Sequence, residues 1–313
     1  MQKFMRMILI SLLLASVFSM VFVLGCEEEA APEEPEPTAE ISEISQQQLQ
    51  QILLDSMLAL KDVESYKMKI DMDMTMNISG GPEEGTADMI MAMEGAIDQV
   101  NMEMQMTMNM SMNMVGADVE ESLQDMSMEM YMVADSMYMK MDIPELGEQW
   151  IKMPLTEKMM EAYNFNMVDQ QLALLESPGE VTLLRYESID DSECYVIHLV
   201  PDLEKIIDWL DQQQMTEMEL AWEELSMLSD IFKELTYICW IAKDTKYMKK
   251  MTANMLMEMS ADDFTEMEDD FGTMTMGTNM DMIMYDHNKT VSIVLPDEAE
   301  NAMEMPQFGD MMK

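Results

Sequence analysis

The sequence predicts a mainly antiparallel β protein, a strongly curved sheet or half-barrel of about eleven strands with helices packed on its concave face. The first observation is an alternation of methionine with polar residues: between Asn101 and Met114 every second residue is methionine. Successive side chains of a strand point to opposite faces, so such a run gives the sheet one polar and one apolar face. The second observation is three amphipathic stretches, which need apolar surface to cover. The third is strand length, since segments this long favour a curved sheet.

The elements follow in order along the chain. Ser45 and Gln48 form a capping box, which predicts a helix over 45–61. Apolar residues three or four apart predict two further helices, over 156–177 and 202–234. Asp244-Thr245 and Asp286–Asn288 are expected to be hairpin turns. The predicted strands are 65–79, 87–98, 101–115, 125–134, 136–143, 150–153, 181–189, 193–200, 236–243, 246–259, 271–285 and 290–295.

The N-terminus predicts export. Lys3 and Arg6 precede an apolar stretch of 18 residues, Met7–Leu24, so residues 1–25 are expected to be a signal peptide. The stretch is also just long enough for a retained transmembrane anchor, which is the alternative. Val23–Cys26 resembles the bacterial lipoprotein box, which favours lipidation of Cys26 and an extracytoplasmic protein anchored to a membrane. Residues 26–44 are acidic and proline-rich, as in an extended tether.

Continuous alternation without a second linker predicts one β domain over 45–300, followed by a disordered tail over 301–313. The net charge is −45 at pH 7. Removal of residues 1–25 takes away Lys3 and Arg6 and no acidic residue, which leaves 15 basic and 62 acidic residues and a net charge of about −47. This charge argues against nucleic acid as a partner, because phosphates need Lys and Arg to neutralise them.

Three cysteines suit an exported protein. With Cys26 assigned to the lipid, Cys194 and Cys239 remain, each within a predicted strand. We expect a disulfide between them, and the alternative is a pair of buried free thiols.

The order of elements resembles the LolA-like and LppX-like lipoprotein-carrier fold over most of residues 45–297. The resemblance rests on the lipoprotein signal, the N-terminal helix and short strand signatures. These signatures are Tyr66–Met68, Gln149–Lys152, Val200-Pro201, Trp240–Tyr247 and Val294–Pro296. It implies an open half-barrel with helices as a lid, in which acyl chains or lipids bind. The methionine bias departs from the usual Val, Leu and Ile lining.

The sequence therefore predicts a membrane-tethered lipoprotein that carries or senses a lipid or other apolar ligand on a methionine-lined wall, since methionine re-packs around varied ligands. The residues predicted to line that wall are Met72, Met74, Met91, Met104, Met106, Met108, Met128, Met130 and Met139. Two alternatives remain: a structural or interaction lipoprotein, and a thioether site for Cu(I). No enzyme, cofactor or metal site is expected, because the two histidines, His198 and His287, fall in no catalytic motif.

Overall fold

The computed structural model describes residues 44–81, 84–116, 119–143, 147–155, 179–203, 205, 231–260 and 272–304. These residues form a single sheet of twelve strands, with the helix α2 (Gln46–Lys61) and a short 3₁₀-helix, η3 (Asp297–Asn301). The predicted helix over 156–177 and most of the one over 202–234 lie outside the described residues. So do the predicted signal peptide, all but the last residue of the predicted tether, and residues 305–313.

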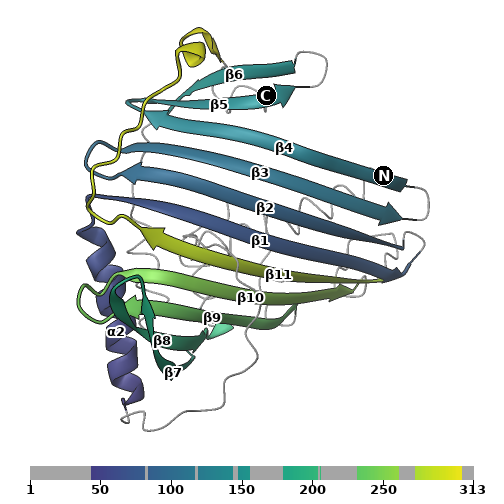
Figure 1. Ribbon diagram of the computed structural model, residues 1–313. Helices are drawn as coiled ribbons and strands as arrows, with labels where there is room; N and C mark the ends of the chain where they lie inside the picture. The colour runs from purple at the N-terminus through teal and green to yellow at the C-terminus, as the bar shows by residue number, and fades with distance from the viewer. Residues whose placement is uncertain are drawn as a thin grey trace.

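Two antiparallel meanders build the sheet. One runs from β1 to β6 and the other from β7 to β11, and they join where β1 pairs with β11, from Lys67 opposite Tyr285 to Gly80 opposite Gly272 (Figure 1). The spatial order is β12-β6-β5-β4-β3-β2-β1-β11-β10-β9-β8-β7. The strands are β1 (Ser65–Gly80), β2 (Gly85–Asp98), β3 (Glu103–Gly116), β4 (Val119–Val133), β5 (Ser136–Ile143), β6 (Gly147–Pro154), β7 (Glu180–Ile189), β8 (Ser192–Val200), β9 (Phe232–Ala242), β10 (Met248–Ser260), β11 (Gly272–Tyr285) and β12 (Met303–Glu304).

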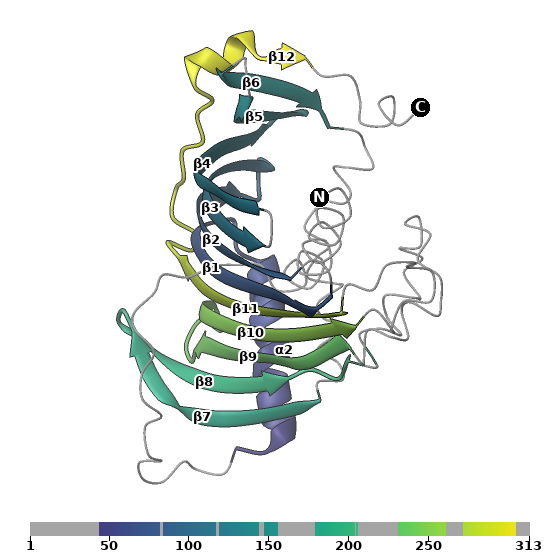
Figure 2. The same ribbon diagram turned by 90° about the vertical axis from the view of Figure 1, so that its right-hand side faces the viewer.

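The sheet is strongly curved and does not close, because its edge strands β7 and β12 do not pair with each other (Figure 2). Long strands accumulate the right-handed twist of β structure. Register shifts in the β3–β4, β7–β8 and β9–β10 pairs add local bends. The predicted fold class is confirmed, and the architecture is the half-barrel that the LolA-like and LppX-like resemblance implies.

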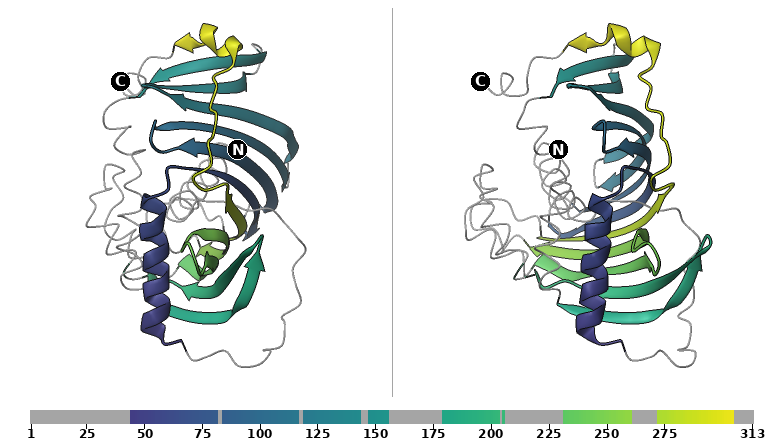
Figure 3. Two further views of the ribbon diagram at one scale, coloured as in Figure 1. Left: turned by 60° about the vertical axis from the view of Figure 1, so that its left-hand side comes forward. Right: turned by 90° about the vertical axis from the view of Figure 1, so that its left-hand side faces the viewer.

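Helix α2 is the predicted first helix and begins as predicted. The Ser45 hydroxyl accepts a hydrogen bond from the Gln48 backbone N–H at 3.3 Å, and the Ser45 N–H donates to the Gln48 side-chain oxygen at 2.9 Å. Leu49, Leu53 and Met57 are buried in the main apolar core, and the helix packs against β7 and β9 (Figure 3). The helix thus covers apolar surface at the β7–β9 end of the sheet.

The prediction of a strand over 290–295 is wrong. Residues 290–296 are extended without pairing to the sheet and cross its convex side from the end of β11 towards β6 (Figure 2). We call residues 288–296 the strap. At one end Asn288 is fixed, since its side-chain oxygen accepts from the Glu64 N–H at 2.7 Å and its backbone N–H donates to the Ser65 carbonyl at 2.7 Å. At the other end η3 buries Ala299 and β12 pairs in parallel with β6.

Three boundaries also differ from prediction. Strand β9 begins at Phe232, within the segment predicted to be helical to 234. Met102 lies in the turn before β3 with a left-handed φ of 55°, so the alternating strand starts at Glu103. The sheet also extends to Met303 and Glu304, which form β12 beyond the last predicted strand.

The predicted Cys194–Cys239 disulfide is wrong, since both cysteines are free and buried. Cys194 pairs with Ala242, three positions along β9 from Cys239. An odd offset places the two side chains on opposite faces of the sheet. Cys239 therefore joins the main core, while Cys194 joins a small cluster with Val196 and Trp240 on the other face.

Candidate functional site

The concave side of the sheet carries a continuous surface of methionine, which we call the methionine face. It consists of the inward side chains of β1–β5 and of β9–β11, and most of its described residues belong to the main apolar core or pack against it. The strap lies over the outward side chains of β1–β3 on the convex side, so the methionine face is on the concave side (Figure 2). The alternation in sequence thus becomes one apolar wall inside the half-barrel.

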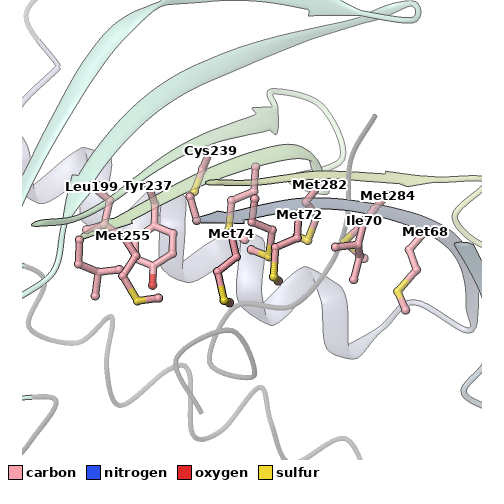
Figure 4. Packing of buried hydrophobic residues seen from close by; sticks show 14 of the residues in the cluster. Met68, Ile70, Met72, Met74, Leu199, Tyr237, Cys239, Met255, Met282 and Met284 are labelled. Carbon is pink, nitrogen blue, oxygen red and sulfur yellow. The ribbon is translucent and has the colours of Figure 1, made fainter. Parts of the chain in front are cut away.

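Strand register aligns the methionines in rows across the sheet. One row runs Met126–Met110–Met91–Met72–Met280, and a second runs Met128–Met108–Met93–Ile70–Met282–Met251. Directly opposite residues have Cβ atoms about 4.5–5.5 Å apart, so neighbouring thioethers in a row are in contact range. Figure 4 shows the β1 and β11 part of this surface, with Met68, Met72, Met74, Met282 and Met284 along one side.

Burial changes along the rows. Met257 and Met276 of β10 and β11 are fully buried at 0% exposure, and the inward methionines of β1 are at most 7% exposed. Towards β3–β5 most inward methionines are half-buried, although Met104, Met132 and Met137 are buried, and Met126 at the start of one row is 46% exposed. The wall is therefore packed core over β1, β10 and β11 and in the row Met104–Met132–Met137, and it is partly accessible over the rest of β3–β5.

All nine methionines predicted to line a wall lie on this one face. Met72, Met74 and Met104 are buried. Six others are half-buried: Met91, Met106, Met108, Met128, Met130 and Met139. Among these, Met106, Met130 and Met139 stand in one register row, and Met108 is directly opposite Met128. The alternation in the sequence therefore predicted correctly that these nine methionines share one face of the sheet. Their role in binding stays a prediction.

Two inward positions that we did not predict interrupt the methionine pattern. Thr278 of β11 stands between Met74 and Met255, is 5% exposed, and its hydroxyl has no hydrogen-bond partner among the residues that the structure describes. Gly95 of β2 stands between Met68 and Met106, so that row has no side chain at the β2 position. The sequence signal for both is a break in the alternation, since each takes a place where methionine is expected.

The polar groups next to the buried part of the face are uncharged. Burial raises the pKa of the Cys239 thiol to about 12 and also raises the pKa of the Tyr237 hydroxyl. Neither group ionises at neutral pH, so the wall carries no charge where it is deepest. Within the described ranges, no three His, Cys, Asp or Glu side chains come together as metal ligands. No helix in those ranges is long and apolar enough to cross a bilayer.

The open curved sheet and its apolar concave wall define a half-barrel, the architecture that the LolA-like and LppX-like resemblance implies. The chain belongs to the family of unknown function DUF6612, whose pattern matches residues 48–304. No curated protein sequence matches it.

Three solved structures are similar to the chain in fold at low sequence identity. LprF from Mycobacterium bovis is 14% identical with a TM-score of 0.42, and the match covers 80% of this chain and 97% of that one. The Mycobacterium tuberculosis lipoprotein LppX is 12% identical with a TM-score of 0.38, covering 80% and 100%. A domain of a putative outer membrane lipoprotein-sorting protein from Vibrio parahaemolyticus is 9% identical with a TM-score of 0.21, covering 78% and 93%.

Proposed function

We propose that the protein is an exported lipoprotein, tethered to a membrane through Cys26, that carries or senses a lipid or another apolar molecule on the methionine face. The observation that carries the proposal is the half-buried part of that face over β3–β5. Soluble proteins seldom leave a broad apolar surface uncovered without a binding role. Flexible thioethers suit a wall that adapts to an acyl chain of irregular shape.

The hydroxyl of Thr278, which has no hydrogen-bond partner in the described part of the chain, supports the same proposal. A buried polar atom without a partner is uncommon in a native protein and needs an explanation. Ligand sites are mostly apolar with a few polar groups that fix orientation. In this proposal Thr278 donates a hydrogen bond to the polar end of the ligand, for example a carboxyl or ester oxygen.

The proposal assigns no catalytic residue. Most side chains of the methionine face are thioethers and aliphatic groups, and the neighbouring Cys239 thiol and Tyr237 phenol stay protonated at neutral pH. The chemistry that such a wall offers is non-covalent binding.

A photoreactive fatty acid tests the site. Cells producing the full chain are fed a diazirine-bearing fatty acid, irradiated, and the labelled peptides of the purified protein are mapped by mass spectrometry. We expect labelling of β3–β5 peptides at their methionine positions. Met108→Asp, which puts a charge on the half-buried wall, should reduce labelling strongly because burying a carboxylate against an acyl chain is costly.

Ser111→Asp is the matched control, because it adds the same charge to the same strand on the opposite face. Its labelling should equal that of the unaltered protein. Labelling that is absent, or that both variants reduce equally, would refute the assignment of the site. Thr278→Val tests the polar contact, and it should weaken labelling by fatty acid more than labelling by a diazirine alkane.

For the anchor, Cys26→Ser should abolish incorporation of radiolabelled palmitate into the protein. Incorporation that persists in the variant would overturn the assignment of Cys26.

A further inference from the structure

The convex side of the sheet holds a polar hollow of about 540 Å³. Its roof is the strap, at Val291 and Ser292, and its floor is the outward face of β1–β3. This volume falls within the roughly 300–1,000 Å³ of small-molecule sites. The hollow lies across the sheet from the methionine face and is separate from the site described above.

The floor of the hollow is concave because its middle strand has short side chains. Ala92 and Ala96 are the outward residues of β2 on either side of Glu94, and each stands between two longer polar residues. The neighbours in register are Lys67 and Gln105 for Ala96, and Asp71 and Asn109 for Ala92. Small residues between long ones leave space that a ligand can fill.

One wall of the hollow is a row of uncharged polar side chains. Gln105, Thr107 and Asn109 are successive outward residues of β3, about 7 Å apart. None of the three makes a side-chain hydrogen bond to any residue that the structure describes. Amide groups both donate and accept, and a hydroxyl does the same. The row therefore matches a ligand that presents several hydroxyl groups along its length.

The centre of the floor adds a carboxylate and an aromatic ring. One oxygen of Glu94 accepts a hydrogen bond from the Tyr285 hydroxyl at 3.2 Å, which fixes both side chains. The other oxygen of Glu94 has no partner in the described part of the chain. A carboxylate oxygen only accepts, so its natural partner in the ligand is a hydroxyl donor.

The four charged side chains that line the hollow balance one another, so the lining itself favours no strongly charged ligand. Two lysines, Lys67 and Lys69, face two carboxylates, Asp71 and Glu94. Lys67 is also held by Asp286 at 3.0 Å. The net charge of −45 repels anions over the whole surface. The ligand that fits this hollow is neutral and rich in hydroxyl groups.

We propose that the hollow between the strap and β1–β3 binds a neutral sugar of one or two rings. Gln105, Thr107 and Asn109 bond to hydroxyl groups along one edge of the sugar, and Glu94 accepts from a hydroxyl over the floor.

Isothermal titration of the full chain, in a detergent without a sugar headgroup, tests the proposal. The probes are glucose, galactose, mannose, N-acetylglucosamine, maltose, cellobiose and lactose, with citrate and spermidine as charged comparisons. We expect at least one neutral sugar to bind in a way that Ala92→Phe abolishes, and citrate not to bind; any binding of spermidine, which the net charge of −45 attracts, should be unaffected by Ala92→Phe. Asn109→Ala should weaken that binding roughly three- to tenfold, the usual effect of one lost hydrogen bond. Ala92→Phe should abolish it by filling the hollow.

Asn113→Ala is the matched control, because Asn113 is equally exposed on the same strand and face but does not line the hollow. Its sugar affinity should be unchanged. Ala92→Phe should fold normally, since an aromatic residue suits an outward strand position. Absence of binding at about 10 mM of every neutral sugar would overturn the proposal. Binding that survives Ala92→Phe in a folded variant would overturn it as well. Either result leaves the lipid-binding proposal untouched, because the two sites lie on opposite faces.

Discussion

Truncation of Met276 measures how much the packed part of the methionine face contributes to stability. Met276 is 0% exposed and stands in register between Met76 of β1 and Met257 of β10, which are 6% and 0% exposed. Met276→Ala removes three buried heavy atoms. Substitutions of this kind cost about 2–5 kcal/mol, depending on how far the cavity collapses.

The neighbours of Met276 decide where in that range the cost falls. Both flanking residues are methionines, whose unbranched side chains can move into part of the vacated space. We therefore expect a loss of about 2–3 kcal/mol in the free energy of unfolding. For a domain of this size, that corresponds to a fall in Tm on the order of 5–10 °C.

The assay is urea unfolding followed by circular dichroism, with Met126→Ala as the matched control. Met126 is 46% exposed at the accessible end of a row, so its truncation should cost less than about 1 kcal/mol. An equal cost for both variants would refute the difference in burial between β11 and β4. A cost below about 1 kcal/mol for Met276→Ala would refute the packing of the wall as core.

Three further predictions follow from the burial of particular groups. Cys194 and Cys239 should not react with maleimide until the protein unfolds, and a reductant should leave the unfolding midpoint unchanged. A disulfide between them, detected as an intact mass lower by about two hydrogens than that of the dithiol form, would contradict free thiols. Burial lowers the pKa of the His287 imidazole from 6.5 to about 4. The contribution of the neutral imidazole to the free energy of unfolding is therefore complete above pH 6.5, and it is lost as the pH falls from 6.5 towards 4 because the unfolded chain takes up the proton first. NMR titration should show this pKa and should not show it in His287→Phe, whereas titration of His287 near 6.5 would contradict its burial between Tyr66 and Tyr247. Under hydrogen peroxide, Met126 and Met303, which are 46% and 50% exposed, should form sulfoxide before Met251 and Met276, both 0% exposed; the reverse order would contradict the burial pattern.

The fold was largely predictable because its signal is local. Alternation with a period of two requires only that successive side chains point to opposite faces, and it located most strands to within a few residues. The same rule placed the nine predicted methionines on one face without knowledge of the strand order.

Features that depend on register were not predictable in the same way. The disulfide prediction failed because knowing that each cysteine lies in a strand does not say which face of the sheet it takes. The register places Cys194 and Cys239 on opposite faces. The prediction of a strand over 290–295 failed because the β-branched residues Val291, Ile293 and Val294 favour an extended backbone, although β1–β3 beneath them already pair on both sides. The sequence marks Thr278 and Gly95 only as positions where the alternation of methionine is interrupted. Their place on the methionine face follows from the residues opposite them in the neighbouring strands.

Native mass spectrometry of the full chain, purified from membranes and released from detergent in the spectrometer, tests the central claim most directly. Lipid binding on the methionine face predicts adduct masses of acyl lipids that survive a chelator wash and are lost in Met108→Asp but not in Ser111→Asp. A protein mass without adducts, unchanged after addition of lipid, would contradict lipid binding on the methionine face and favour a structural lipoprotein. Cu(I) bound at a defined stoichiometry in place of lipid would contradict it as well and favour a thioether metal site.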